Sequence, residues 1–347
     1  MTEPRDIEKL RRWQIQHSRY SAAKRAAYRD WRKRRNLENN VGIRKEGSIL
    51  VRAPSELSLI DSAAATFEFI GRILSHVHRG HKIYIDLSEV TSVRQGAVMA
   101  LIAALQNAKD NGRRPSIRGN WPKSDQCTSF LVQSGFLEYL YSVPRQHSSD
   151  SLFFPISSGH DSGNDIARAL TDFYIRHAVA GEVSLTRHRL YGALIECMTN
   201  TKNHAFTNVE GKRCRWWVTA HFDKPAGRIR FTFFDNGLGI PTTVRQRLME
   251  ALLRELGPTE ALIDCKLLTS AMNGEERTST KKANRGKGLE SIHRSFTEGY
   301  IDSLVVLSNS AHFDARKTDS EPLSGPLTGT LFTWSVPTIP ADVSVVA

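Results

Sequence analysis

Three short polar motifs in the C-terminal half of the chain limit its possible folds more than any other feature. In chain order they are Glu196 and Asn200 with either Asn203 or His204, then Asp235 to Gly239, then Gly286 to Leu289. Each motif alone is common and has a plain structural explanation, as a helix face, a turn or a helix start. Their order and setting together indicate one nucleotide-binding site.

The first motif lies in a segment whose apolar residues recur at helical spacing, from Tyr191 to Asn200. In a helix, Glu196, Asn200 and either Asn203 or His204 share one face, a turn apart. A face with a carboxylate and amides can hold a cation and a water.

The second motif follows a segment, residues 228–234, that alternates towards apolar side chains as a strand does. Asp235 therefore stands at the end of a predicted strand. Gly237 and Gly239 carry no Cβ, so a ligand can approach the backbone closely. A carboxylate in this place can accept a hydrogen bond from an amino group.

The third motif precedes an amphipathic helix that we expect over residues 289–296. The N–H groups near Gly286 and Gly288 and the start of that helix favour an anion, and phosphate is the natural one. Lys287 between the glycines either contacts a phosphate or points to solvent.

Together these motifs resemble the ATP-binding domain of the superfamily that contains gyrase, Hsp90, histidine kinases and MutL. The resemblance covers about residues 160–338. It implies an α/β sandwich in which a mixed sheet is covered by helices on one face. It also implies ATP and Mg²⁺ as cofactors.

The same resemblance implies a role for individual residues. Glu196 would position or activate the attacking water or hydroxyl, and Asn200 would coordinate Mg²⁺. Asp235 would bind the adenine amino group, beside Thr330 on a late strand. The remaining residues expected to bind the cofactor are Asn203, His204, Gly237, Gly239, Gly286, Lys287, Gly288 and Leu289. The third motif departs from the family's glycine-rich pattern, because Lys287 separates its glycines and Arg285 precedes them.

Between the second and third motifs, residues 241–284 correspond to the ATP lid of this superfamily. Residues 242–257 have the apolar spacing of an amphipathic helix, with Gly257 as its stop. Residues 273–284 are polar without apolar periodicity. They are expected to form either a lid that orders over the phosphates or an ordinary surface loop.

At 347 residues the chain has room for two domains with real cores. It contains no apolar run of the roughly 20 residues that a membrane helix needs, and a cytoplasmic location without membrane contact is expected. The four cysteines are scattered without metal-ligand spacing, which indicates neither a zinc site nor a disulfide framework.

Charge is concentrated at the N-terminus. The net charge is +12, and residues 1–46 carry 14 lysines and arginines against 6 acidic residues. Bases interleave with Trp13, Tyr20, Tyr28 and Trp31 on predicted helices. This basic helical arm is expected either to bind nucleic acid or an acidic partner, or to dock its aromatic side chains on its own domain.

Residues 47–145 alternate strand and helix signals, which favours an α/β domain. Strands are expected at residues 48–52, 82–87 and 115–118 and near Tyr139, and helices at residues 59–78, 96–110 and 128–134. The run from Asp86 to Gly96 and the later residues 130–137 are similar to the STAS domain of anti-sigma-factor antagonists.

That family has a phosphorylated serine just ahead of the glycine, whereas Arg94 and Gln95 stand there in this chain and Ser92 lies only nearby. The STAS-like region is therefore expected either to bind partners or to serve packing alone. Residues 146–165, rich in Ser, Gly, Pro and Asp, are expected to link it to an ATP-binding domain over residues 166–340.

His160 in this linker formally resembles a phosphoacceptor histidine, but neighbouring glycine and serines favour a loop, which argues against a two-component histidine kinase. Three functions remain open. The chain is a serine/threonine protein kinase similar to the anti-sigma kinases, an ATPase switch, or a nucleotide sensor without turnover. A protein partner is expected, with nucleic acid binding through residues 1–46 and a homodimer as further options.

Overall fold

A computed structural model describes residues 44–45, 47–136, 139, 151–178, 183–204, 214–245, 260–275 and 288–338. The predicted basic arm lies outside these residues except for Arg44 and Lys45. The chain forms two compact units, Met1–Leu50 and Val51–Ala347. Helices and strands are mixed throughout the described residues, so the α/β class expected from the sequence is confirmed.

The first unit contributes one described hairpin. Strand β1 (Arg44–Lys45) pairs antiparallel with the start of strand β2 (Ser48–Arg52). Gly47 makes the turn with a φ of 72°, a left-handed conformation that glycine adopts without strain.

The N-terminal layer of the second unit contains the parallel strands β4 and β6, which continue a sheet whose order is β1-β2-β4-β6. Its elements follow the alternation expected from the sequence. They are β3 (Glu56–Leu57), α2 (Ala63–His78), β4 (Lys82–Asp86), β5 (Ser92–Val93), α3 (Gln95–Asp110), β6 (Ser116–Gly119) and α4 (Asp125–Gln133). The strands at 48–52, 82–87 and 115–118 and the three helices are confirmed to within a few residues.

The strand expected near Tyr139 is wrong, because Tyr139 is helical. Gly135 ends α4 with a φ of 81°, and the Tyr139 carbonyl accepts a hydrogen bond from Lys109 Nζ at 3.4 Å rather than from a strand. The Tyr139 ring packs against the apolar core of this layer. A single aromatic residue after a glycine was therefore too short a signal for a strand.

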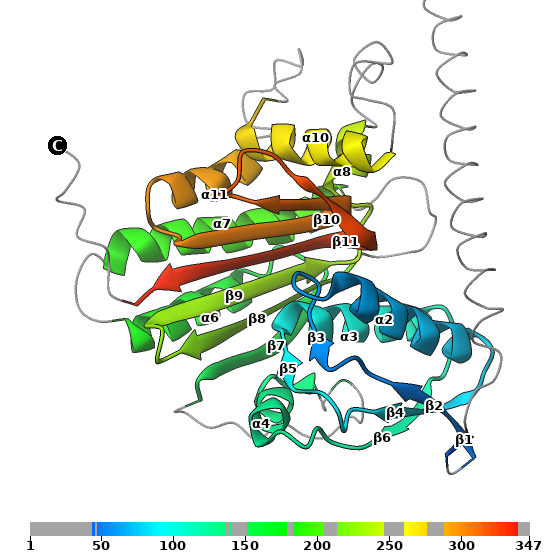
Figure 1. The fold of residues 1–347 in the computed structure, drawn as a ribbon. Coiled ribbons are helices and arrows are strands. Elements are labelled where there is room, and N and C mark those ends of the chain that lie inside the picture. The colour runs from blue at the N-terminus through cyan, green and yellow to red at the C-terminus, as the bar shows by residue number, and fades with distance from the viewer. Residues whose placement is uncertain are drawn as a thin grey trace, which may run out of the picture. The chain divides into compact units, whose positions relative to one another are not determined.

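The C-terminal part of the second unit contains a five-stranded sheet in the order β10-β11-β9-β8-β7. Its strands are β7 (Phe153–Gly159), β8 (Trp216–Asp223), β9 (Arg228–Asp235), β10 (Ser303–Asp314) and β11 (Glu321–Pro337). Every neighbouring pair is antiparallel, so the expectation of a mixed sheet is wrong. Strand β11 lies between β9 and β10 (Figure 1), and it therefore separates these two strands, which run in the same direction.

Strand β7 lies inside the segment expected to be a linker. It pairs with β8 and forms an edge of the sheet. Pro155 and Gly159 are tolerated there because an edge strand leaves one side of its backbone unpaired, and the pairing shifts register between Phe154 and Ser157. The Pro and Gly content that indicated a linker is thus also compatible with an edge strand.

Apolar residues alternate along the sheet strands and point to two different cores. Trp216, Phe233 and Phe332 pack in one cluster with helices α6 (Asn164–His177) and α7 (Val183–His204). Their sequence neighbours Trp217, Phe234 and Leu331 join the core of the N-terminal layer, with α2 and α3. Figure 1 shows α6 and α7 on one side of the sheet and α2 and α3 on the other, so helices cover both faces.

Three further helices lie towards β10. Helices α8 (Ile240–Arg245), α10 (Glu260–Asn273) and α11 (Gly288–Thr297) pack together through Val244, Leu267 and Leu289. The buried ion pair between Arg245 and Asp264 joins α8 to α10 at 2.5 Å. Of the helix predicted over residues 242–257, only the part up to Arg245 is described, and residues 276–287 of the predicted lid also lie outside the described residues.

Candidate nucleotide site

Helix α7 carries the first motif, as predicted. Leu190, Leu194 and Met198 are buried in the core beneath the sheet, which fixes the rotation of the helix about its axis. Glu196 and Asn200 lie at the boundary of that buried stripe, partly exposed, one turn apart. Asn203 and His204 are the last residues of α7, and their side chains lie outside the described residues.

Glu196 faces the start of helix α11. A Cβ placed on Gly288, the first residue of α11, would overlap the Glu196 carboxylate, so the two residues are in direct contact. Burial raises the pKa of Glu196 above its ordinary value. The first and third motifs are therefore adjacent, as a common nucleotide site requires.

Asn200 has an unmet hydrogen-bonding group. Its side-chain Nδ2 is buried, and the described residues offer it no hydrogen-bond partner. Buried polar atoms in folded proteins are almost always paired, and this donor beside the candidate site can bond an oxygen atom of a ligand.

Asp235 ends strand β9 opposite Thr330 on β11. The carboxylate is almost fully buried, and its Oδ1 accepts a hydrogen bond from the Gly237 backbone N–H at 2.8 Å. Burial raises the pKa of Asp235 to about 7, although the N–H groups of Gly237 and Thr330 act in the opposite direction. This side chain is thus short of polar partners for its charged form.

The electrostatics place Asp235 near the helical motif. The pKa of Cys197, which follows Glu196 on α7, is raised by burial and then by the charges of Asp235 and Glu196. The pKa of Cys214, just ahead of β8, is raised to about 11 by burial and by the charge of Asp235. Both cysteines are free thiols, and the charge of Asp235 raises the pKa of both.

The loop after Asp235 is held by a bulge in strand β10. Gly239 has a φ of 86°, and a Cβ there would lie 2.5 Å from Asn309 Oδ1. The Asn309 amide donates to the Leu238 carbonyl at 2.9 Å and accepts from the Thr242 N–H at 3.1 Å. Ser308 Oγ accepts from the Ile240 N–H at 2.9 Å. These contacts fix the conformation of the Asp235–Gly239 loop.

Sequence reasoning missed Ser308 and Asn309. The signal was available, because three polar residues, 308–310, interrupt the apolar run of β10. Asn309 is also the one non-glycine residue with a positive φ, 52°, in the described part of the chain. Gly329 was missed as well. It is required beside Asp235, because a Cβ at this position would collide with the Asp235 backbone carbonyl.

Thr330 lies where it was predicted, beside Asp235. It is buried, and its hydroxyl is 3.1 Å from Ser308 Oγ. Leu289 packs against apolar clusters, so its side chain serves packing. Gly286 and Lys287 lie outside the described residues. The structure therefore brings Glu196, Asp235, Gly288 and Thr330 to one end of the sheet, with Asn200, Gly237 and Gly239.

These residues fit Mg·ATP on two observations. Asn200 Nδ2 is a buried donor without a partner in the described residues and can donate to a ligand oxygen, and the buried Asp235 carboxylate has capacity beyond its backbone N–H partners for a ligand donor. The Glu196 carboxylate occupies the space that a Cβ would take at Gly288, so the two motifs are in direct contact. Within the described residues, no group of three or more His, Cys, Asp or Glu side chains is arranged to hold a metal ion.

Comparison with protein-family models finds no match for this chain, and a search of curated proteins finds no significant match. His160 lies in a loop, as expected, with its Nδ1 2.8 Å from the Cys214 carbonyl. No helix among the described residues has the length and apolarity to cross a membrane.

Proposed function

We propose that this protein binds Mg·ATP through an ATP-binding domain of the gyrase, Hsp90, histidine-kinase and MutL type, and that it acts in signalling as a serine/threonine protein kinase. The observation that carries the proposal is Asp235. Its carboxylate is buried at a strand end near the helix that carries Glu196 and Asn200, and burial raises its pKa to about 7, an arrangement that is common at functional sites.

In this proposal Asp235 accepts a hydrogen bond from the adenine amino group. That hydrogen bond favours the ionised carboxylate, and it replaces partners that the protein itself does not provide. The rigid loop held by Asn309 and Ser308 keeps the carboxylate and Gly237 in place before the nucleotide arrives.

Asn200 would hold Mg²⁺ through its amide oxygen, together with the phosphates of the nucleotide. The ion neutralises phosphate charge when it is bound. Glu196 would orient the attacking hydroxyl or water and take its proton, and a raised pKa suits that task near neutral pH. Gly288 would let the backbone at the start of α11 approach the phosphates.

The proposal extends to the region before this domain. The STAS-like region lacks the usual serine, and Gln95 in its place is buried and accepts a hydrogen bond from Thr232 Oγ1 of the sheet at 3.0 Å. A phosphorylated hydroxyl cannot arise there. The kinase target would therefore be a separate protein or another residue of this chain, and a cytoplasmic location is part of the proposal.

An ATPase switch is the second candidate. The observation that favours it is the hydrogen bond from Asn236 Nδ2 to Asn107 Oδ1 at 2.6 Å, because Asn236 belongs to the proposed adenine loop and Asn107 to helix α3. Nucleotide binding at the loop would then change a direct contact with helix α3 of the STAS-like region.

A single assay separates these functions. The protein is incubated with Mg·ATP labelled on the γ-phosphate, with and without candidate protein substrates. Label on protein identifies a kinase, and label released as phosphate identifies an ATPase. Binding with neither product would identify a sensor and overturn the kinase proposal.

Two variants make the assay specific. Glu196→Ala should lower turnover by about 100-fold or more while ATP still binds, because Glu196 acts on the nucleophile rather than on adenine. Glu89→Ala removes an exposed carboxylate of the other layer and serves as the matched control. Equal turnover in both variants would exclude Glu196 as the catalytic residue.

A further inference from the structure

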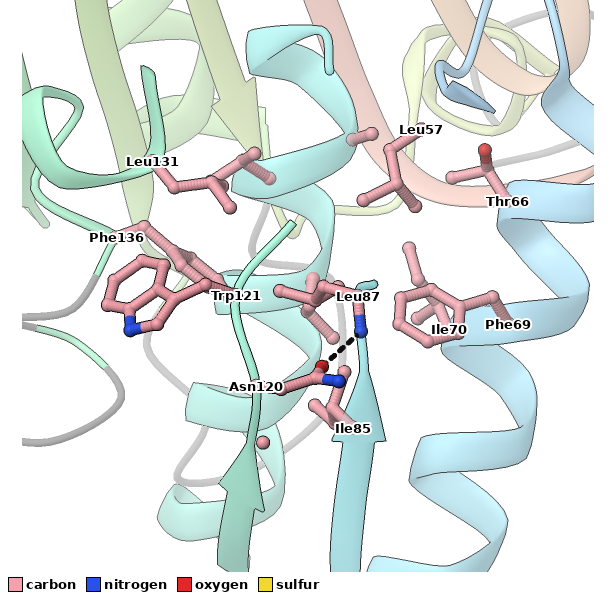
Figure 2. A pocket seen from close by; sticks show the side chains of 14 residues that line it. Leu57, Thr66, Phe69, Ile70, Ile85, Leu87, Asn120, Trp121, Leu131 and Phe136 are labelled. Atoms are coloured by element: carbon pink, nitrogen blue, oxygen red, sulfur yellow. Dashed lines mark hydrogen bonds between the residues drawn. The ribbon is translucent and has the colours of Figure 1, made fainter. Parts of the chain in front are cut away.

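A cavity of about 260 Å³ lies within the N-terminal layer, at a place that none of the three motifs reaches. All its lining residues fall between Leu57 and Phe136. Figure 2 shows side chains from α2, α3, α4 and the ends of β4 and β6 converging on it.

The wall of this cavity is apolar. None of its 14 lining residues is charged, and Phe69, Ile70, Leu101 and Phe136 are among those that form it. Each of these four is less than a tenth exposed. A charged group placed here would lose its hydration without gaining a partner, so the wall excludes ions.

Two polar side chains in the wall, Asn120 and Thr66, are bonded within the protein. Asn120 Oδ1 accepts from the Leu87 N–H at 2.7 Å, and its Nδ2 donates to Asp86 Oδ1 at 2.7 Å. Thr66 Oγ1 donates to the Ser58 carbonyl at 2.9 Å and accepts from the Ser58 N–H at 3.1 Å. Each polar atom of these two side chains is therefore bonded within the protein, so the wall favours an occupant held by shape and apolar contact.

The volume sets the size of the occupant. A cavity of about 150 Å³ lined by Leu, Ile and Phe side chains takes up benzene, so this larger one suits about ten heavy atoms. Trp121, 45% exposed, lines the cavity and lies next to Phe136 in Figure 2. We propose that the cavity binds a neutral, apolar molecule of about ten heavy atoms and that helix α3 couples this site to the nucleotide loop.

Helix α3 is the common wall of the two regions. Ala97, Val98 and Leu101 line the cavity. One residue ahead of them, a Cβ on Gly96 would lie 2.8 Å from Leu331 Cδ2, so the helix packs tightly on the sheet. Further along, Asn107 holds Asn236 of the proposed adenine loop. A ligand that shifts α3 therefore shifts a contact of that loop. This coupling rests on the proposed function, whereas the apolar site does not.

Direct binding tests the site without nucleotide. The probes are 1-octanol and naphthalene, with octanoate as the charged counterpart of octanol. Ligand-observed NMR and the fluorescence difference between the wild type and Trp121→Phe report occupancy. Octanol and naphthalene should bind, and octanoate should bind at least about tenfold more weakly. Equal binding of octanol and octanoate, or no binding of either neutral probe, would overturn the site.

A substitution that fills the cavity tests whether octanol binds there. Val98→Phe places a ring in the cavity and should weaken octanol binding by about tenfold or more. Val132→Phe makes the same change on α4 at a position that is 50% exposed, and its octanol affinity should equal that of the wild type. If Val98→Phe does not fold, Leu101→Ala enlarges the cavity instead and should admit 1-dodecanol, which the wild type rejects. Identical probe binding in the lining variant and its surface control would contradict the location.

The coupling is measured as the change in ATP affinity at saturating octanol, expected to be at least about fivefold. Asn107→Ala should bind octanol normally and lose this response, whereas Gln133→Ala on the surface of α4 should retain it. Octanol binding without an effect on ATP affinity would overturn the coupling and leave the site. No ATP binding at all, with octanol binding intact, would overturn the proposed function alone.

Discussion

The candidate nucleotide site and the apolar cavity of the second unit differ in how their polar groups are bonded. At the candidate nucleotide site, Asp235 is buried with a raised pKa, and Asn200 Nδ2 has no hydrogen-bond partner in the described residues. In the apolar cavity, every polar side-chain atom of Asn120 and Thr66 has a hydrogen-bond partner within the protein. The difference shows that buried polar residues mark a polar ligand only where their own bonding capacity is left open.

Replacing Asp235 and replacing Asn120 should therefore change the free energy of unfolding in opposite directions. The pKa of Asp235 rises from 3.8 to about 7 on folding. Its contribution to stability is complete below about pH 4 and is lost as the pH rises through 7. Between pH 5 and pH 8 this loss is about 3 kcal/mol, and Asp235→Asn should abolish it. Urea unfolding at several pH values, without nucleotide, measures the effect. A wild type and variant with parallel pH profiles would contradict the assignment.

Asn120→Ala should instead destabilise the protein by about 2 to 3 kcal/mol at every pH. It removes both hydrogen bonds and leaves the Leu87 N–H buried without its acceptor. Gln133→Ala, which removes an exposed amide bonded to Ser129, is the control and should cost less than about 0.5 kcal/mol. If Asn120→Ala were as harmless as this control, the wall of the cavity would not be saturated as described.

The packing of α3 between the two regions can be tested with two glycines in helices. Gly96→Ala places a methyl group against the buried Leu331, whereas a methyl group at Gly192 on α7 meets nothing within 4 Å. The second substitution should stabilise by about 0.5 to 1 kcal/mol and the first should destabilise, a difference of about 2 kcal/mol in unfolding free energy. Equal stabilities of both variants would mean that α3 is not tightly seated on the sheet.

Proton release should accompany nucleotide binding. Because the adenine amino group favours ionised Asp235, the apparent ATP affinity should be about tenfold higher at pH 8 than at pH 6, which is about 1.4 kcal/mol. Calorimetry with excess magnesium in buffers of different ionisation enthalpy gives both the affinity and the protons released. A flat affinity profile with no proton release would separate Asp235 from nucleotide recognition.

Many helices and strands of this fold could be predicted because the local spacing of apolar residues determines them. Apolar spacing located α7 and β9, and Asp235 follows from a strand that must end where its glycines begin. The antiparallel order of the sheet was not predictable, since it depends on β11 inserting between β9 and β10. Strand β7 was missed because Pro155 and Gly159 indicate a break equally well in a linker and in an edge strand.

The relation between the two layers could not be derived from local sequence. Paired aromatic residues such as Trp216–Trp217 and Phe233–Phe234 indicate that both faces of the sheet are buried, but not what covers them. The cavity depends on how α2, α3 and α4 meet, and no residue pattern encodes a space between helices. The polar residues around Asn309 could have indicated that it holds the Asp235–Gly239 loop. Its left-handed backbone conformation could not have been predicted from them.

Calorimetric titration of Mg·ATP into the folded protein tests the central claim most directly. The wild type and the surface control Asp165→Asn should bind one nucleotide with the same affinity, whereas Asp235→Asn should bind at least about 100-fold more weakly with its fold intact. Unchanged ATP affinity in Asp235→Asn, or no heat on titration of well-folded wild type at millimolar nucleotide, would contradict the account.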